Sequence, residues 1–492
     1  MKFISTRGKD SADSAGKAIV QGLASDGGLF VPESFPNLSD KIKDMLDMSY
    51  SERANLVIGS YLEEYGDKLF SFCEKSEGRF EDLDPAPLVK LDEVFYVLEL
   101  FHGPTLAFKD IALTLLPSLL RQGANDNGVK EDILILVATS GDTGKAALSG
   151  FQDQEGIKII VFYPSEGVSD MQKLQMCSQE GDNVCVVGIN GNFDDCQNAV
   201  KQIFSSDKAH QILKENNVVL SSANSINFGR LVPQIVYYFS AYCDLVGANQ
   251  IKLGDKINFV VPTGNFGNIL AGYYAKQMGL PIEKLVCASN SNNVLTEFFL
   301  SGDYDKNREF FKTTSPSMDI LISSNLERLI FELSNRNGEL TKQRMEELKN
   351  NGKYSISKEE KKALGKDFFA GYCDEEECAE TIADIFEYYG YVLDPHTAVA
   401  VKVYGELKSF EGNALPTVVL STASPYKFPQ SVLKAINGKK ISDAFVSSSV
   451  LEELTAMPIP EQILELKNKE KRFTKVIEKE QAFDAVLDFI KG

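Results

Sequence analysis

The chain has 492 residues, too many for one compact core, so two or three domains are expected. A hydrophobic content of 43% and a charged content of 25% are those of an ordinary soluble protein, and no apolar run approaches the length of a membrane span. The net charge of −19 argues against a nucleic-acid-binding protein, because nucleic-acid phosphates would repel it.

The N-terminus and the cysteines indicate a cytoplasmic protein without a metal. The first seven residues lack the apolar core of a signal peptide. The eight cysteines are scattered, and the closest pair, Cys373 and Cys378, has no histidine nearby. That is not zinc spacing, and the whole chain has only three histidines. Buried thiols in a reducing compartment are therefore expected.

Residues 1–90 are expected to form a small leading domain. The stretch 22–32 is rich in glycine and typical of turns, and residues 51–64 have a helical pattern. The division expected for the rest is a core at 91–335 with an inner α/β subdomain at about 130–225, a charged helical insertion at 336–390, and a C-terminal part at 391–492 that completes the core sheet.

Residues 101–110 place Lys109 in an apolar turn with Gly103 and Pro104, at the start of a helical pattern that Pro117 should kink or stop. Apolar walls and the positive end of a helix both lower the pKa of a lysine. A lysine with a lowered pKa can form a Schiff base with an aldehyde. From these residues alone, an ordinary lysine at a helix start is an equal alternative.

From residue 133 onward, short apolar strands alternate with helices, which predicts an α/β fold with mostly parallel sheets. In such sheets ligands bind beyond the carboxyl ends of the strands, where the loops 139–144, 263–268 and 421–424 fall. The pattern predicts strands at 133–137, 158–162, 184–187, 218–221, 256–262, 285–288 and 417–420, and helices at 145–152, 169–178, 193–213, 227–245 and 269–278.

The loop 263–268 joins a buried strand to a helix and contains two glycines. This arrangement presents backbone N–H groups to a phosphate, although its glycine spacing is that of neither a P-loop nor a dinucleotide fingerprint. Glycines in a tight turn are the common alternative. A phosphate loop combined with an activated lysine suggests pyridoxal 5′-phosphate, which carries both an aldehyde and a phosphate.

Several motifs, in order along nearly the whole chain, resemble the threonine synthase family, which has the tryptophan-synthase-β-like fold of pyridoxal-phosphate enzymes. The resemblance implies two parallel-type α/β domains with the cofactor in the cleft between them, plus a small N-terminal domain and a helical insertion. The motifs are residues 4–8, 21–32, 101–110, 138–144, 224–227 with Arg230, 263–268, 315–321, 394–399 and 420–425.

The resemblance implies roles for the cofactor-binding residues. Lys109 would form the Schiff base and shuttle protons, Thr422 would meet the pyridine nitrogen, and Asp142 would lie beside the ring hydroxyl. A neutral hydroxyl at the ring nitrogen does not keep that nitrogen protonated as a carboxylate would. The cofactor phosphate would be held by Gly264, Asn265, Phe266, Gly267 and Asn268.

The resemblance also implies a substrate site for O-phospho-L-homoserine. Arg230 would bind the substrate phosphate, with a structural ion pair as the alternative. His396 is expected to be a packed, hydrogen-bonded residue rather than a ligand, and Ser424 stands where relatives often have histidine. The other expected substrate residues are Thr139, Ser140, Thr143, Asn224, Ser225 and Asn227, while the family-typical residues of 315–328 receive no role.

The reaction implied is the last step of threonine biosynthesis: γ-elimination of phosphate followed by β-addition of water, giving L-threonine. A monomer or homodimer without nucleic-acid or membrane partners is expected. Two alternatives remain open: a related lyase such as a threonine dehydratase or a phosphohomoserine phospho-lyase, and a non-catalytic relative. The product separates threonine synthesis from the lyases, which would yield 2-oxobutanoate.

Overall fold

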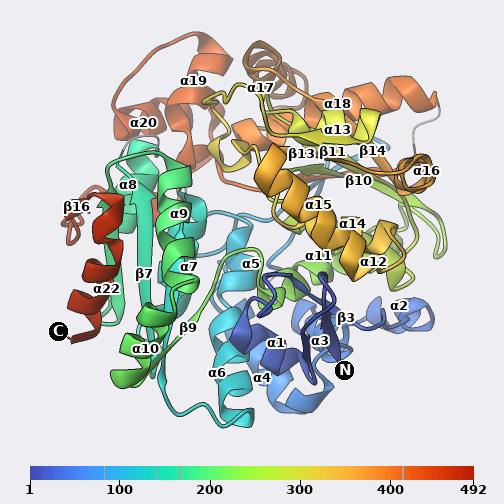
Figure 1. Cartoon of the computed structure of the whole chain (residues 1–492). Coiled ribbons are helices and arrows are strands. Elements are labelled where there is room, and N and C mark those ends of the chain that lie inside the picture. The colour runs from blue at the N-terminus through green and yellow to red at the C-terminus, as the bar shows by residue number, and fades with distance from the viewer. Residues whose placement is uncertain (82–83, 140, 166–167, 413–414, 492) are drawn as a thin grey trace.

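The computed structural model describes residues 1–81, 84–139, 141–165, 168–412 and 415–491. Figure 1 shows three parts: N-terminal helices with a small sheet in blue, an α/β body on the left around β7, and a second α/β body on the upper right around β10 and β11. Helix α5 (Lys109–Leu113) lies in the middle, between the two α/β bodies. The predicted α/β fold class is confirmed.

The N-terminal part contains a three-stranded antiparallel sheet in the order β2-β1-β3. Ser14 caps its first helix by accepting a hydrogen bond from the N–H of Lys17. The elements are β1 (Phe3–Ser5), β2 (Ser11–Ala12), α1 (Ala15–Gln21), β3 (Phe30–Pro32), α2 (Ile42–Met45), α3 (Tyr50–Gly59) and α4 (Lys68–Glu77).

The larger body is built on a six-stranded sheet in the order β14-β11-β10-β15-β5-β4. All neighbouring strands are parallel except β4 and β5. The central strands β10 and β15 are mostly apolar and buried along their whole length, as expected for strands whose two faces are both covered. The strands are β4 (Leu88–Lys90), β5 (Phe95–Glu99), β10 (Ile257–Pro262), β11 (Ile282–Ser289), β14 (Phe368–Tyr372) and β15 (Thr417–Ser421).

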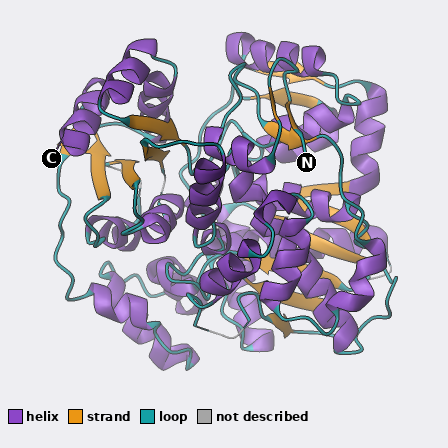
Figure 2. Cartoon of the chain, turned by 90° about the horizontal axis from the view of Figure 1, so that it is seen from below, coloured by secondary structure: helices purple, strands orange, loops and turns teal. Residues whose placement is uncertain are grey.

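The smaller body is built on a five-stranded, all-parallel sheet in the order β16-β8-β7-β6-β9. In Figure 2 helices flank the sheets of both bodies. The strands are β6 (Asp132–Ala138), β7 (Ile157–Pro164), β8 (Val184–Ile189), β9 (Val218–Ser221) and β16 (Val476–Ile477). Within residues 391–492, β15 completes the six-stranded core sheet, whereas β16 and α22 (Ala482–Lys491) join the smaller body.

The remaining helices match the predicted pattern with one difference. The predicted helix 193–213 is two helices, because the chain breaks at Ser205 and Ser206 caps the second one. The stop expected near Pro117 is present: α5 ends at Leu113, and Pro117 is the second residue of the next helix, since proline fits the first helical turn. The helices are α6 (Leu116–Asp126), α7 (Asp142–Phe151), α8 (Asp170–Cys177), α9 (Phe193–Phe204), α10 (Asp207–Glu215), α11 (Phe228–Gly247) and α12 (Gly267–Gln277).

Residues 336–390 are not purely helical, because they also provide β14, the edge strand of the six-stranded sheet. A separate two-stranded ribbon pairs β12 (Asp303–Asp305) with β13 (Lys353–Ser355). The helices of this half are α13 (Val294–Ser301), α14 (Leu326–Leu333), α15 (Gly338–Asn351), α16 (Lys358–Asp367), α17 (Glu375–Tyr389), α18 (Pro395–Glu411), α19 (Pro429–Asn437), α20 (Ala444–Thr455) and α21 (Glu461–Leu466). Among the described residues, no helix is long and apolar enough to cross a membrane.

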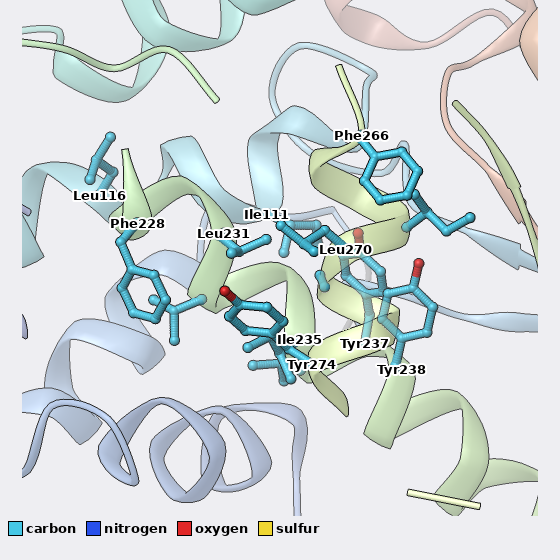
Figure 3. Packing of buried hydrophobic residues seen from close by; sticks show 14 of the residues in the cluster. Ile111, Leu116, Phe228, Leu231, Ile235, Tyr237, Tyr238, Phe266, Leu270 and Tyr274 are labelled. Carbon is cyan, nitrogen blue, oxygen red and sulfur yellow. The ribbon is translucent and has the colours of Figure 1, made fainter. Parts of the chain in front are cut away.

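The core between the parts is organised around α11, which is buried along most of its length. Figure 3 shows Phe228 and Leu231 of α11 near Leu116 and Ile111, and Tyr238 near Leu270 of α12. Helix α5 contacts both α11 and α7, so Lys109 stands on a rigid base.

Candidate active site

A cavity of about 1170 Å³ is lined by residues of both α/β bodies. Strands β6, β10 and β15 each end at it, followed by Thr139, Thr263 and Thr422. All three loops predicted to hold ligands therefore lie at one cavity, as expected for the carboxyl ends of parallel strands.

Lys109 is the first residue of α5, and its side chain lines the cavity. Its Nζ lies 3.7 Å from Oδ2 of Asp142 and 4.7 Å from the ring centroid of Phe108. Burial lowers the pKa of Lys109; Asp142 opposes this shift, and the positive charges of Arg230 and Lys427 add to it. The predicted lowering of the Lys109 pKa agrees with the structure. Its causes there are burial and the two cations, whereas the sequence pointed to apolar walls and the helix.

The turn before Lys109 is held from both sides. Asp110 accepts hydrogen bonds from the N–H and the hydroxyl of Thr105, at 2.8 and 2.6 Å. On the other side, the N–H of Phe108 donates to the carbonyl of Thr422 at 2.9 Å. These contacts tie Lys109 to the end of β15, the strand next to β5, which precedes Lys109 in the chain.

Asp142 begins α7 and is 2% exposed. Its Oδ1 accepts from Nε2 of Gln172 at 2.8 Å and lies 3.0 Å from Nζ of Lys427, and its Oδ2 accepts from the hydroxyl of Ser317 at 3.2 Å. Burial alone would raise the pKa of this carboxyl, but Lys427 and Lys109 lower it far below its usual range. Asp142 is therefore an ionised carboxylate beside Lys109.

The loop after β10 forms a cradle of free N–H groups. Phe266 has a left-handed backbone with φ 63°, and α12 begins directly after it. The backbone N–H groups of residues 264–268 have no hydrogen-bond partner in the described part of the chain. A Cβ on Gly264 would lie 2.7 Å from the carbonyl oxygen of Ser317, so only glycine fits there.

Asn268 adds an orphaned side-chain donor to this cradle. Its Oδ1 accepts from the hydroxyls of Tyr237 and Tyr238, at 2.6 and 3.0 Å. Its buried Nδ2 has no partner. Because such a donor is costly to leave unpaired, the cradle fits an anion with several oxygens, such as a phosphate.

Thr422 and His396 also line the cavity. Within the described residues the Thr422 hydroxyl has no hydrogen-bond partner, so it is available to a ligand. His396 accepts the Ser317 N–H at Nε2, at 3.2 Å, and its Nδ1 donates to Asp394 at 2.8 Å. Both ring nitrogens are thus occupied, although the ring borders the cavity.

Arg230 reaches the cavity from the first turn of α11. Its Nη1 donates to the carbonyl of Ala223 at 2.6 Å, and its buried Nε has no partner. Burial lowers the pKa of Arg230 to about 10. The ion pairs found among the described residues do not include Arg230, which leaves its charge available to an anionic ligand.

The other predicted substrate residues are only partly brought together. Thr143, Asn224 and Ser225 line the cavity. Thr139 does so too, but its hydroxyl accepts the N–H groups of residues 141 and 144. Asn227 is fully buried and caps α11, so it does not face the cavity. Ser140 lies outside the described residues.

Lys427 and Gln172 were missed by the sequence analysis, although both contact Asp142. Lys427 belongs to the stretch that follows Thr422, which was noted only for Ser424. A lysine with no exposed side-chain surface cannot be recognised from spacing alone.

Comparisons with known proteins agree with this geometry. The family model of the threonine synthase N terminus matches residues 2–76, that of pyridoxal-phosphate dependent enzymes matches 80–350, and that of the threonine synthase C-terminal region matches 397–490. The threonine synthase of Pseudomonas aeruginosa is 41% identical over 438 residues, which cover 88% of this chain and 90% of that protein.

The human protein threonine synthase-like 1 is 41% identical over 488 residues, which cover 94% of this chain. The chain spans 65% of the length of that protein. Among solved structures, the pyridoxal-phosphate-bound threonine synthase from Brucella melitensis superposes with a TM-score of 0.87 at 38% identity, covering 100% of this chain and 99% of that one. Pyridoxal 5′-phosphate is the cofactor that these findings support, and the chain belongs to the threonine synthase family of pyridoxal-phosphate-dependent enzymes.

Proposed function

We propose that the chain is a threonine synthase, which converts O-phospho-L-homoserine and water to L-threonine and phosphate. Relatives from bacteria and yeast that carry this name support the proposal. The mammalian relatives are named threonine synthase-like 1, so the family alone does not assign the reaction.

One observation carries the proposal: two separate anion-binding features open into the same cavity as Lys109. The free N–H groups of residues 264–268 and Nδ2 of Asn268 suit the phosphate of the cofactor. Arg230 provides a second buried cation, which forms no ion pair with a carboxylate among the described residues. A lyase acting on an amino acid without phosphate would have to bind only the α-carboxylate besides the cofactor phosphate, whereas O-phospho-L-homoserine brings a further anionic group that Arg230 would meet.

The residues present fit pyridoxal 5′-phosphate. Lys109 would attach it covalently, the loop 264–268 would hold its phosphate, and Asp142 and Thr422 would contact its ring. When bound, the cofactor supplies an electron-withdrawing ring that makes the α-hydrogen of an amino acid acidic. The Thr422 hydroxyl, a neutral group, would leave that withdrawal moderate.

Lys109 would carry the protons of the reaction. A lysine with a lowered pKa can accept a proton at Nζ from the substrate Cα and return it to a neighbouring carbon. The Asp142 carboxylate next to Nζ stabilises the ammonium form that results. Arg230 would bind the substrate phosphate and stabilise it as it leaves, after which water adds at Cβ.

The test compares Arg230→Gln with Arg230→Lys on O-phospho-L-homoserine. A hydrogen bond to a charged group contributes about 1.5–3 kcal/mol, so Arg230→Gln should lower kcat/KM roughly ten- to a hundred-fold. Binding of homoserine, which lacks the phosphate, should change little. Arg79→Gln is the control, since Arg79 is half-buried, donates to the carbonyl of Ser149, and does not line the cavity. Equal weakening of both substrates would show that Arg230 does not bind phosphate.

A further inference from the structure

Lys427 is a buried ammonium group with three partners from different parts of the chain. Its side chain has no exposed surface. Its Nζ donates to the carbonyl of Thr105 at 2.8 Å and to Oε1 of Gln175 at 3.1 Å, and lies 3.0 Å from Oδ1 of Asp142. Burying a charge is costly unless it is paired and hydrogen-bonded, so this arrangement indicates a specific use for the charge.

The contacts of Lys427 join the two α/β bodies. Asp142 and Gln175 lie on α7 and α8 of the smaller body. Lys427 follows β15 of the larger body, as part of the short 3-10 helix Pro425–Lys427. Ser317, also from the larger half, reaches Oδ2 of the same carboxylate. Asp142 is therefore held at the boundary between the bodies by groups that all donate to it.

The held carboxylate faces the reactive lysine, because Oδ2 of Asp142 lies 3.7 Å from Nζ of Lys109. We infer that Lys427 is a positioning residue. It keeps Asp142 ionised and fixed opposite Lys109, and its positive charge weakens the stabilisation of the Lys109 ammonium form by that carboxylate. This inference rests on the proposed role of Lys109 in attaching the cofactor.

The sign of the effect follows from the charges. Without Lys427, no neighbouring ammonium group partly neutralises the Asp142 carboxylate. This carboxylate then stabilises the protonated form of Lys109 more strongly, so the pKa of Lys109 rises. Without the Asp142 charge, Lys427 alone acts on Lys109, and the pKa of Lys109 falls further. The charged or titratable groups around this pair are Lys427, Arg230, Asp110 and His396.

The experiment follows covalent capture of pyridoxal 5′-phosphate by the full chain freed of cofactor. Capture requires a neutral Lys109 amine, so its rate against pH reports the pKa of Lys109 without any turnover. Absorbance gives the rate, and borohydride trapping with peptide mapping confirms the labelled residue. The variants are Lys427→Met, Asp142→Asn, the double variant and Lys427→Arg. Lys276→Met is the control, because it removes a lysine–aspartate pair of 2.8 Å, with Asp367, that does not line the cavity.

The inference predicts shifts of opposite sign. The capture midpoint of Lys427→Met should move up by roughly one to two pH units, and that of Asp142→Asn should move down. The double variant should return toward the wild-type midpoint, and Lys427→Arg and Lys276→Met should stay near it. Shifts of the same sign, or no shift, in variants that unfold cooperatively on heating would overturn the inference.

If Lys427→Met does not fold, the inference is tested by two other midpoints: the capture midpoint of Asp142→Asn should still move down, and that of the double variant should still return toward the wild-type value. If wild-type protein is never labelled at Lys109, the proposed function fails; if it is labelled but the midpoints do not separate, only the role of Lys427 fails.

Discussion

At the scale of single residues, Lys109 and Lys145 make an informative pair. Burial lowers the pKa of both, that of Lys145 to about 8. Lys145 donates to Oε1 of Gln179 at 2.6 Å and does not line the cavity. Lys109 has the free N–H groups of residues 264–268 in the same cavity. A lowered pKa alone therefore does not identify the lysine that binds the cofactor; we propose that the adjacent cradle of N–H groups selects Lys109.

We expect borohydride to fix pyridoxal 5′-phosphate on Lys109 and not on Lys145. Lys109→Ala should abolish the fixed label, whereas Lys145→Ala should keep it, as read by mass spectrometry of the peptides. A label that follows Lys145 would mean that nucleophilicity, and not the cradle, selects the site.

At the scale of elements, the glycine loop depends on close backbone packing. The hydroxyl of Ser323 donates to the carbonyl of Gly264 at 2.7 Å, and Nδ2 of Asn325 donates to that of Asn265 at 3.1 Å. These bonds occupy the two carbonyls, while the N–H groups of residues 264–268 stay without a partner among the described residues. The loop thus needs partners about sixty residues further along the chain, which a local pattern does not reveal.

Gly264→Ala should weaken cofactor binding at least tenfold. The new Cβ would lie 2.7 Å from the carbonyl oxygen of Ser317 and 3.2 Å from Cα of Met318, so the cradle must shift. Equilibrium titration with pyridoxal 5′-phosphate measures the loss. Gly365→Ala is the matched control, because nothing lies within 4 Å of its Cβ and alanine favours a helix by about 0.5–1 kcal/mol. Unchanged affinity in Gly264→Ala would contradict the proposed cradle.

Most elements could be predicted from the sequence, since apolar strands and capped helices are local signals. The predicted helix 169–178 is one example: its first residue, Ser169, caps α8 and accepts the N–H of Gln172 in a capping box. Strand β16 could not be predicted, because a two-residue strand is too short to show an alternating apolar pattern. It forms only by pairing with β8, which is distant in the sequence. The break at Ser205 was missed because the apolar face continues across it.

At the scale of the whole molecule, the N-terminal part is clamped to the larger body near the cavity. Nε and Nη2 of Arg7 donate to the two carboxylate oxygens of Glu327 at 3.0 and 2.9 Å, and the Thr6 hydroxyl donates to the same group at 2.6 Å. Arg328 follows Glu327 in α14, is buried, and donates to the carbonyls of Phe30 and Ile226. The N-terminal part is thereby connected to the segment that leads to Arg230.

Arg7→Gln should lower the free energy of unfolding by about 1–3 kcal/mol, because it leaves the Glu327 carboxylate largely buried without its cation. Urea unfolding measures the loss, and hydrogen exchange should locate it in residues 1–32. The exposed pair of Lys17 and Asp13 supplies the control, since Lys17→Gln should change stability by less than about 0.5 kcal/mol. Equal effects of both variants would show that the clamp contributes nothing.

The sequence was enough to predict the chemical groups of the candidate site, but not the contacts that those groups make with distant parts of the chain. The loop 264–268 and Thr422 stand next to recognisable strand ends and Lys109 stands at a helix start, and the structure brings them to one cavity. Asn227 was expected to bind substrate but caps α11, because an asparagine before a helix serves either purpose in a sequence. Lys427 acts across the boundary of two bodies, and only the folded chain shows its partners.

The most direct test of the account is the product formed from O-phospho-L-homoserine in water enriched in oxygen-18. The account predicts L-threonine that carries the heavy oxygen in its hydroxyl group, in equal amount to the phosphate released, and no product with Lys109→Ala. Release of phosphate with 2-oxobutanoate in place of threonine, or no release of phosphate at all, would contradict it.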